Sequence, residues 1–243
     1  MSSGSGRHKT NQAAPAYSPP RLRKTLTFPQ RVLTMTIEAV LFDFGNVLAR
    51  FDYHRALDRL GAPRGASAPE LLRRLDQGGF ATVHADYECG RIDSRTLAAQ
   101  FNAILGWSVP FEEFATAYQE IFELNPPVAQ LARDLKAAGY LLGLGSNTGE
   151  LHSSWFLKTY ADLFIQFDHL ILSHQIGVKK PHPAFYDHAL RAMKVAPSAC
   201  LFVDDLAENV QAARKQGLVA VHYEFNTTNL VEALAHLGVR VNR

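Results

Sequence analysis

The 243-residue sequence has few cysteines, and it has no hydrophobic run long enough to cross a membrane. Its two cysteines, Cys89 and Cys200, match no metal-binding or redox spacing, so we expect free thiols in a reducing compartment. A membrane-spanning helix needs about 20 consecutive apolar residues. The composition, with 47% hydrophobic and 20% charged residues, is typical of globular proteins. Together these features predict a soluble cytoplasmic protein with no membrane partner.

Acidic residues are absent from positions 1–34, which contain six basic residues: Arg7, Lys9, Arg21, Arg23, Lys24 and Arg31. In the rest of the chain, the other 19 of the 25 basic residues stand against all 23 acidic ones. The globular part is therefore slightly acidic, which argues against nucleic-acid binding. The first 34 residues are rich in Ser, Pro and Gly, which predicts a disordered basic leader. Whether translation begins at Met1 or at Met35 stays open.

Strand and helix patterns alternate through most of the remaining sequence, and this alternation predicts an α/β fold with a parallel sheet covered by helices on both faces. Short runs rich in Val, Leu, Ile and Phe indicate strands at 37–42, 140–145, 169–172, 199–203 and 219–222. Apolar residues at helical spacing indicate helices at 128–138, 183–193, 206–216 and 229–237.

A different pattern fills the stretch from Phe51 to Asn125, which contains no convincing strand. Segments with helical spacing are separated there by Gly and Pro, and they lie at 53–60, 69–75, 94–105 and 111–124. We therefore predict a helical cap at 53–125. It would be inserted into a core made of residues 35–52 and 126–243.

Polar residues follow several of the predicted strands. Asp43 ends the first strand, Ser146 ends the second, and Asp204 and Asp205 end the fourth, while Lys180 lies in the segment after the third. The carboxyl ends of parallel strands share one edge of a sheet, and open α/β sheets bind their ligands there. Each residue alone is more readily explained as a helix cap or a surface charge. Together they predict one site.

These residue types suit phosphoryl transfer. A carboxylate such as Asp43 can take a phosphoryl group and so split hydrolysis into two steps. Asp204 and Asp205 beside Asp43 would repel one another unless a hard cation lay between them, and Mg²⁺ prefers such oxygen ligands. Lys180 and the donors of Ser146 and Asn147 could then hold the phosphoryl oxygens.

Four motifs in order make the sequence resemble the haloacid dehalogenase-like hydrolase superfamily. They are Asp43-Phe-Gly-Asn-Val47, Ser146-Asn-Thr148, Lys180-Pro181 and Asp204-Asp-Leu-Ala-Glu-Asn209. The resemblance spans about residues 37–240 and implies a Rossmann-like core, Mg²⁺ and an aspartyl-phosphate intermediate. It makes Asp43 the nucleophile. It gives the metal to Asp43, the Gly45 carbonyl, Asp204 and Asp205, and it places substrate on Asn46, Ser146, Asn147 and Lys180, with Asn209 orienting the metal shell.

The position of the insertion, directly after the first motif, resembles the subfamily with a helical cap. The segment Glu88-Cys-Gly-Arg-Ile92 is similar to one in its glucose 1-phosphate phosphatase-like and epoxide hydrolase N-terminal-domain-like members. That resemblance implies a phosphatase of small phosphorylated metabolites, with sugar phosphates favoured. The expected assembly is a monomer or homodimer.

The first motif departs from the family at Gly45, where an acidic residue usually acts as general acid and base. Three explanations stay open. Asp52, or a residue such as His54 or Glu88, supplies the proton; the leaving group needs little protonation; or the protein binds phosphorylated ligands without turnover. A 2-haloacid dehalogenase is a further alternative, which the Asp204-Asp205 pair disfavours.

Overall fold

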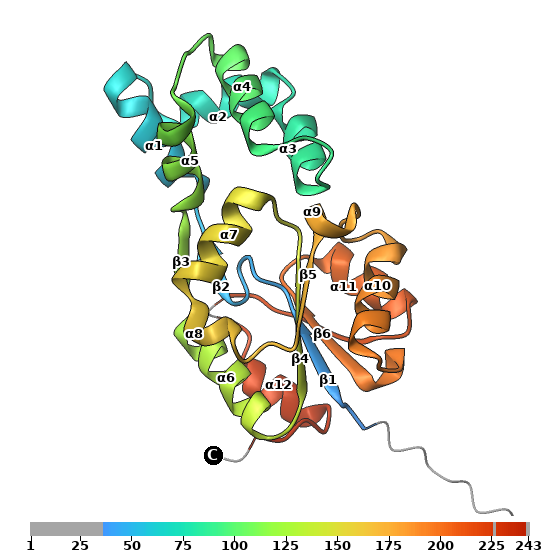
Figure 1. Cartoon of the computed structure of the whole chain (residues 1–243). Coiled ribbons are helices and arrows are strands. Elements are labelled where there is room, and N and C mark those ends of the chain that lie inside the picture. Colours follow the sequence, from blue (N-terminus) through green and yellow to red (C-terminus); the bar gives the residue numbers. More distant parts are fainter. Residues whose placement is uncertain (1–35, 226, 242–243) are drawn as a thin grey trace, which may run out of the picture. The chain divides into compact units, whose positions relative to one another are not determined.

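The computed structural model describes residues 36–225 and 227–241, so the predicted leader lies outside the described residues. Five strands form a parallel sheet in the order β5-β4-β1-β6-β7 (Figure 1). They are β1 (Ala39–Phe42), β4 (Leu141–Ser146), β5 (His169–Leu172), β6 (Cys200–Asp204) and β7 (Val219–His222). The predicted α/β fold class with a parallel sheet is confirmed.

Strand β1 lies at the centre of the sheet, and the chain adds strands first on one side of it and then on the other. All four of its residues are buried, which explains why its sequence is a continuous apolar run. Phe42 pairs with Leu144 of β4 and with Val203 of β6. Because strand order reverses at β1, its carboxyl end is where an open α/β sheet binds ligands.

Helices pack on both faces of the sheet, because side chains in each strand alternate between the two faces. Val40 and Phe42 belong to one apolar cluster, whereas Ala39 and Leu41 belong to another. The first cluster includes residues of α6 (Pro126–Ala137), α7 (Glu150–Thr159), α8 (Ala161–Phe164) and α12 (Leu230–His236). The second includes residues of α10 (Pro183–Met193) and α11 (Ala207–Lys215). No helix in the described ranges is long and apolar enough to cross a membrane.

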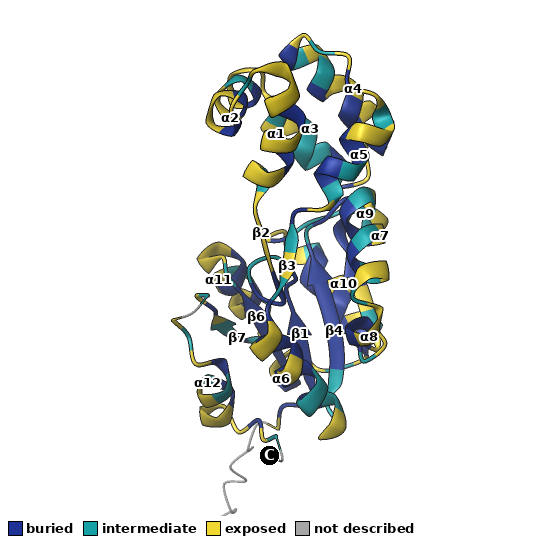
Figure 2. Ribbon diagram, turned by 90° about the vertical axis from the view of Figure 1, so that its left-hand side faces the viewer, coloured by how far each residue is buried: buried dark blue, intermediate teal, exposed yellow. Residues whose placement is uncertain are grey.

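Between β2 (Ala49–Phe51) and β3 (Phe122–Leu124) the chain forms five α-helices, here called the helical insertion. They are α1 (Tyr53–Gly61), α2 (Ala68–Gln77), α3 (Phe80–Glu88), α4 (Ser94–Leu105) and α5 (Phe111–Gln119). Each carries buried and exposed residues (Figure 2), and the buried ones form a third apolar cluster of their own. The insertion therefore has its own small core.

The expectation that residues 51–125 contain no strand is wrong. Two short strands, β2 (Ala49–Phe51) and β3 (Phe122–Leu124), pair antiparallel on either side of the insertion. The helix predicted at 111–124 accordingly ends at Gln119. Three-residue strands are too short to show a period of two, so an apolar group such as that around Phe122 fits a helix equally well. The helices α3, α7, α8 and α9 (Ser173–Ile176) were not predicted either.

Candidate active site

Acidic side chains meet at the carboxyl edge of the sheet. Asp43 follows β1, and Asp204 and Asp205 stand at the end of β6. One carboxylate oxygen from each of the three lies within 4.8 Å of the others. The pairing of β1 with β6 causes this meeting, because Phe42 and Val203, the residues before Asp43 and Asp204, are partners in the ladder.

Lys180 lies between two of these carboxylates. Its Nζ donates to Oδ1 of Asp43 and to Oδ2 of Asp204, at 2.7 Å each, and its side chain is 1% exposed. Burial lowers the pKa of Lys180, but the two carboxylates outweigh burial, so the pKa lies above its ordinary value. Burial raises the pKa of Asp43 to about 7, an effect that Lys180 opposes and that Asp204 and Asp205 reinforce.

Asp204 is held by three donors. Besides Lys180 on Oδ2, the backbone N–H of Leu206 and Nδ2 of Asn209 both donate to its Oδ1 at 2.9 Å. The carboxylate is fully buried. Its lone pairs are thus directed to protein donors, so the geometry suits Asp204 to fixing Lys180 in place. The metal-binding role that the family resemblance gives to Asp204 stays a prediction, since its carboxylate is also one of the three that lie close enough to hold an ion together.

Nδ2 of Asn46 donates to Oδ2 of Asp205 at 2.9 Å, and it is the one side-chain donor to this carboxylate in the described part of the chain. Asn46 itself has a positive φ of 54°, a conformation that Asn tolerates better than most residues. Burial raises the pKa of Asp205, and Asp204 adds to the rise while Asn46 opposes it. The amide of Asn46, expected to bind substrate, is therefore turned to a carboxylate.

The charges of the cluster fit a divalent cation. Three carboxylates and the Lys180 ammonium leave two negative charges in a buried space, and a single divalent ion would cancel them. Oxygen donors suit a hard ion such as Mg²⁺. Within residues 36–225 and 227–241, no protein hydrogen bond is made to Oδ2 of Asp43. That oxygen and the carboxylate of Asp205 could hold such an ion.

Ser146 and Asn147 lie at the end of β4 and line a cavity of about 60 Å³, here called the inner cavity. Its other lining residues are Phe44, Gly45, Phe51, Tyr53, Glu88, Phe122, Thr148 and His152. The side chain of Asn147 is already engaged: Oδ1 accepts from the backbone N–H of Lys180 at 2.8 Å, and Nδ2 donates to its carbonyl at 2.9 Å. Asn147 therefore positions Lys180, a role that the sequence motif did not reveal.

The ring of Phe51 covers the position where the family usually has its general acid. A Cβ atom on Gly45 would lie 2.8 Å from Cε1 of Phe51, well inside van der Waals contact. Asp52, the next residue, caps α1 by accepting from the backbone N–H of His54 at 2.9 Å. Neither Asp52 nor His54 lines the inner cavity. The hydrogen bonds of Lys180 and Asn147 thus bring the four motifs together, whereas the Asp52 carboxylate is used as the cap of α1.

Glu88, at the end of α3, does line the inner cavity. Its carboxylate accepts from Nζ of Lys179 at 2.6 Å, and its backbone carbonyl accepts from Oγ of Ser173 at 2.6 Å. These two contacts tie the helical insertion to the segment around α9 (Ser173–Ile176). Lys179 and Ser173 are functional candidates that sequence reasoning missed, because neither belongs to a motif.

Comparisons with known proteins identify the family of the chain. A family model described as haloacid dehalogenase-like hydrolase matches residues 37–217. A D-ribitol-5-phosphate phosphatase of Bacteroides thetaiotaomicron is 28% identical over 194 residues, which cover 74% of this chain and 89% of that protein. A sesquiterpene phosphatase of Aspergillus oryzae is 27% identical over 214 residues, which cover 84% of this chain and 98% of the relative.

Solved structures share the fold. One is an enzyme of the same family from Bacteroides thetaiotaomicron in complex with magnesium and inorganic phosphate. It superimposes with a TM-score of 0.66 at 19% identity, covering 79% of this chain and 97% of that one. At this identity the likeness concerns the fold alone.

Proposed function

The chain belongs to the haloacid dehalogenase-like hydrolase family, and within it we propose a magnesium-dependent phosphatase of small phosphorylated metabolites. The family match and the phosphatase relatives confirm the prediction of a phosphatase. The proposal of a magnesium-dependent reaction rests mainly on one observation. Lys180 lies between Asp43 and Asp204, beside Asp205. A buried carboxylate next to a fixed ammonium suits attack on an anionic phosphate ester.

In the proposed reaction, a carboxylate oxygen of Asp43 attacks phosphorus while the bond to the leaving oxygen breaks. The leaving oxygen takes a proton and departs as an alcohol. Water then attacks the aspartyl-phosphate, which releases phosphate and restores the carboxylate. Lys180 stabilises the phosphoryl oxygens, and Ser146 offers a hydroxyl at the same edge. Mg²⁺, when bound by Asp43, Asp205 and the Gly45 carbonyl, would neutralise negative charge on nucleophile and phosphate.

Two carboxylates are candidates for the proton donor. Glu88 lines the inner cavity, whereas Asp52 caps α1 and would have to release the N–H of His54. We compare Asp52→Asn with Glu88→Gln on alkyl and aryl phosphates. Loss of the donor lowers turnover of alkyl phosphates by about 10²- to 10⁴-fold and affects aryl phosphates less, because their leaving groups need less protonation. A variant with equal losses on both substrates is not the donor.

A non-catalytic phosphate-binding protein is the second candidate, favoured by Gly45 and by the ring of Phe51 over it. Such a protein would release no phosphate from any ester, yet a phosphate analogue would raise its melting temperature. A 2-haloacid dehalogenase would instead release halide without metal. The excess negative charge of the acidic cluster disfavours that reaction.

A phosphate-release assay tests the proposal directly. The panel contains sugar, alditol, alkyl and aryl phosphates, because the relatives' names span an alditol phosphate and a sesquiterpene compound. We expect turnover with Mg²⁺, none with excess EDTA, and none in Asp43→Asn. Asp187→Asn, which changes an exposed carboxylate on α10, is the matched control and should keep full activity. Metal-independent turnover, or activity that survives Asp43→Asn, would overturn the mechanism.

The role of the helical insertion, the location and the oligomeric state also belong to the proposal. We propose that the helical insertion acts as a cap that selects a small substrate over a phosphoprotein. A cytoplasmic location and a monomeric or homodimeric state are proposed on the sequence alone. Size-exclusion chromatography with light scattering checks the second.

A further inference from the structure

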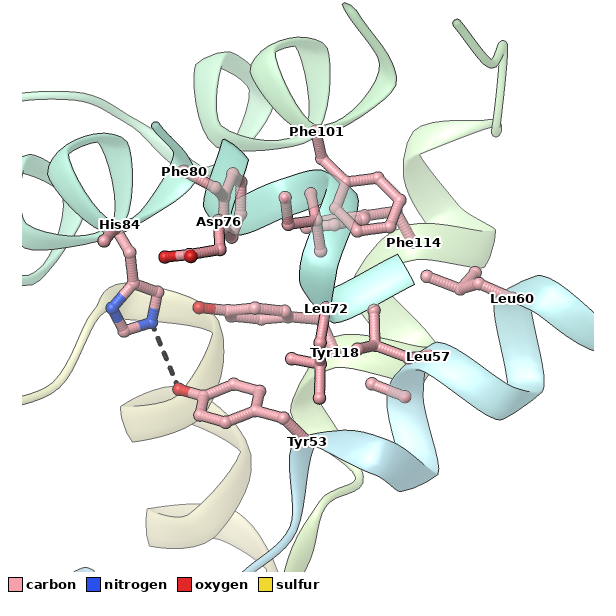
Figure 3. Close-up of a pocket in the computed structure, with 13 residues that line it drawn as sticks. Tyr53, Leu57, Leu60, Leu72, Asp76, Phe80, His84, Phe101, Phe114 and Tyr118 are labelled. Atoms are coloured by element: carbon pink, nitrogen blue, oxygen red, sulfur yellow. Dashed lines mark hydrogen bonds between the residues drawn. The ribbon is translucent and has the colours of Figure 1, made fainter. Parts of the chain in front are cut away.

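A second, larger cavity lies within the helical insertion. It has a volume of about 300 Å³, at the lower end of the range for small-molecule sites. Figure 3 shows the side chains that line it. They come from α1, α2, α3, α4 and α5, and are Tyr53, Ala56, Leu57, Leu60, Leu72, Leu75, Asp76, Phe80, Ala81, His84, Phe101, Phe114 and Tyr118.

The lining of this cavity is apolar and carries no positive charge. Nine of the thirteen residues are Ala, Leu or Phe, and none is Lys or Arg. The hydroxyls of Tyr53 and Tyr118, the ring of His84 and the carboxylate of Asp76 gather toward one end, and leucine and phenylalanine side chains fill the other (Figure 3). Burial lowers the pKa of His84, which favours the neutral imidazole. A second phosphate or carboxylate would find no cation here.

The same lining would bind a sugar weakly. Each buried hydroxyl of a polyol needs a hydrogen-bond partner, and leucine and phenylalanine side chains offer none. The phenol hydroxyl of Tyr118 is buried without a hydrogen-bond partner in the described part of the chain. It can meet a single neutral polar group. The cavity therefore matches a ligand that is mostly hydrocarbon and uncharged.

The large cavity adjoins the candidate active site. Tyr53 lines both it and the inner cavity beside Ser146 and Asn147. The hydroxyl of Tyr53 is hydrogen-bonded at 3.1 Å to Nε2 of His84, another residue of the large cavity. Tyr118, which lines the large cavity, stacks on His152 of the inner one with ring centroids 4.3 Å apart.

The inner cavity is small for a whole substrate. Its volume of about 60 Å³ corresponds to roughly two water-sized groups, whereas the large cavity holds roughly ten, at about 30 Å³ each. With the phosphate at Ser146 and Lys180, the rest of an ester needs space elsewhere. The large cavity next to Tyr53 supplies that space.

We propose that this cavity binds the apolar, uncharged portion of a phosphate monoester whose phosphate lies at the sheet edge. The substrate class is the phosphate ester of a hydrophobic alcohol with roughly ten carbon atoms, from the same volume comparison. This inference rests on the proposed phosphatase function. It names hydrophobic alcohols in place of the sugars that the sequence favoured.

A series of linear alkyl phosphates from butyl to dodecyl tests the inference on the full chain with Mg²⁺. We expect kcat/KM to rise with each methylene up to about decyl phosphate, by up to about fourfold per group, and then to level off. Glucose 6-phosphate should be turned over less efficiently than decyl phosphate. A kcat/KM that is independent of chain length, or highest for sugar phosphates, would overturn the inference.

A cavity-filling variant supplies the structural control. Ala81 is an exposed residue of α3 that lines the cavity, so Ala81→Phe places a ring there without overpacking the core. We expect a loss of at least about tenfold in kcat/KM for decyl phosphate, equal to removing two or more methylenes from the site, and little change for butyl phosphate. Thr82→Phe, at the next and equally exposed position outside the lining, should change neither value.

Binding of alkyl phosphonates, which cannot be hydrolysed, separates this inference from the proposed function. In calorimetry, decylphosphonate should bind more tightly than butylphosphonate, with a more negative heat-capacity change. In Ala81→Phe the two phosphonates should bind with similar affinity and a similar heat-capacity change. If no ester is hydrolysed but this binding pattern holds, the phosphatase proposal fails and the apolar site stands. Equal binding of both phosphonates to the wild type contradicts the apolar site, whatever the enzyme hydrolyses.

Discussion

The carboxyl edge of the sheet and the interior of the helical insertion are built on opposite principles. At the sheet edge, Lys180 bridges Asp43 and Asp204. Asn209 donates to Asp204 and Asn46 donates to Asp205, so the charged groups are close together and held in place. In the insertion, about 300 Å³ is left unfilled among apolar side chains. A fixed array of charges can stabilise the transition state of one reaction. An apolar cavity can select which ligand binds.

The difference also separates two kinds of constraint on the sequence. At the sheet edge, each charge depends on its neighbour, because an unpaired buried carboxylate or ammonium is strongly unfavourable. In the insertion, the lining has only to be apolar and of suitable size, so substitutions there should alter which substrates bind rather than whether catalysis occurs. The following predictions test this contrast, from the largest expected effect to the smallest.

Replacing Lys180 should have the largest effect. Lys180→Met leaves Asp43 and Asp204 buried without their shared counter-ion, so we expect a loss of about 3–5 kcal/mol in the free energy of unfolding. Loss of the ammonium at the phosphate should also lower kcat by about 10²- to 10³-fold. Urea denaturation and phosphate release measure the two effects. Lys136→Met is the matched control, since its ion pair with Asp168 is partly exposed and worth at most about 1 kcal/mol.

Introducing the usual acidic residue at position 45 should be unfavourable for a steric reason. In Gly45→Asp the new Cβ meets the ring of Phe51, so we expect a loss of about 1–3 kcal/mol in the free energy of unfolding. Adding Phe51→Ala to this variant should recover part of the loss beyond the sum of the single changes. A double-mutant cycle by urea denaturation measures the coupling. Additive effects would show that Phe51 does not restrict position 45.

His152, which lies between the two regions, should make the stability depend on pH. Burial lowers its pKa to about 3, against an ordinary value of 6.5, and its Nε2 contacts the Tyr118 carbonyl at 2.9 Å. Below pH 6.5 the unfolded chain takes up a proton that the folded chain does not. Stability is therefore complete above pH 6.5 and falls toward pH 3, by about 1.4 kcal/mol per pH unit.

The variant His152→Gln can keep the hydrogen bond to the Tyr118 carbonyl but cannot titrate. We expect the wild type to lose about 2 kcal/mol more than this variant between pH 7 and pH 5. Urea denaturation at several pH values gives the free energy of unfolding of each protein as a function of pH. The difference between the slopes of these two curves is the quantity to compare. Parallel curves for the two proteins would mean that His152 does not control the pH dependence.

The smallest effect is expected at Tyr118. Its buried hydroxyl has no hydrogen-bond partner among the described residues, so Tyr118→Phe should leave the protein equally stable or more stable by up to about 1 kcal/mol. Tyr87→Phe should destabilise it by about 1–3 kcal/mol, because the Tyr87 hydroxyl accepts from the N–H of Leu151 at 2.7 Å. Thermal unfolding of both variants tests this contrast. Equal destabilisation would assign the Tyr118 hydroxyl a partner.

Much of the sheet could be predicted from the sequence, because β1 and β6 are buried on both faces and therefore read as continuous apolar runs. Residues at their ends could be placed on one edge by topology alone. The hydrogen bonds of Asn46 and Asn147 could not be predicted, since they depend on the loops that follow each strand. The ring of Phe51 over Gly45 depends on the pairing of β2 with β3, two strands too short to show a period.

The insertion was less predictable for a different reason. Apolar residues at helical spacing indicate that helices such as α1 and α4 pack together, but the same pattern arises whether their interface is filled or hollow. The cavity results from the exact directions of side chains such as Leu57 and Phe114. Sequence patterns do not contain that information, so the proposed preference for an apolar ligand rests on the structure.

Transfer of the phosphoryl group to Asp43 is the most direct test of the central claim. The wild-type protein would be mixed with a ³²P-labelled phosphate ester and Mg²⁺, quenched in acid within milliseconds, and digested for peptide mapping. We expect an acid-stable, hydroxylamine-labile label on the peptide that contains Asp43, and no label in Asp43→Asn. Turnover without any labelled peptide, or a label on another residue, would contradict the account.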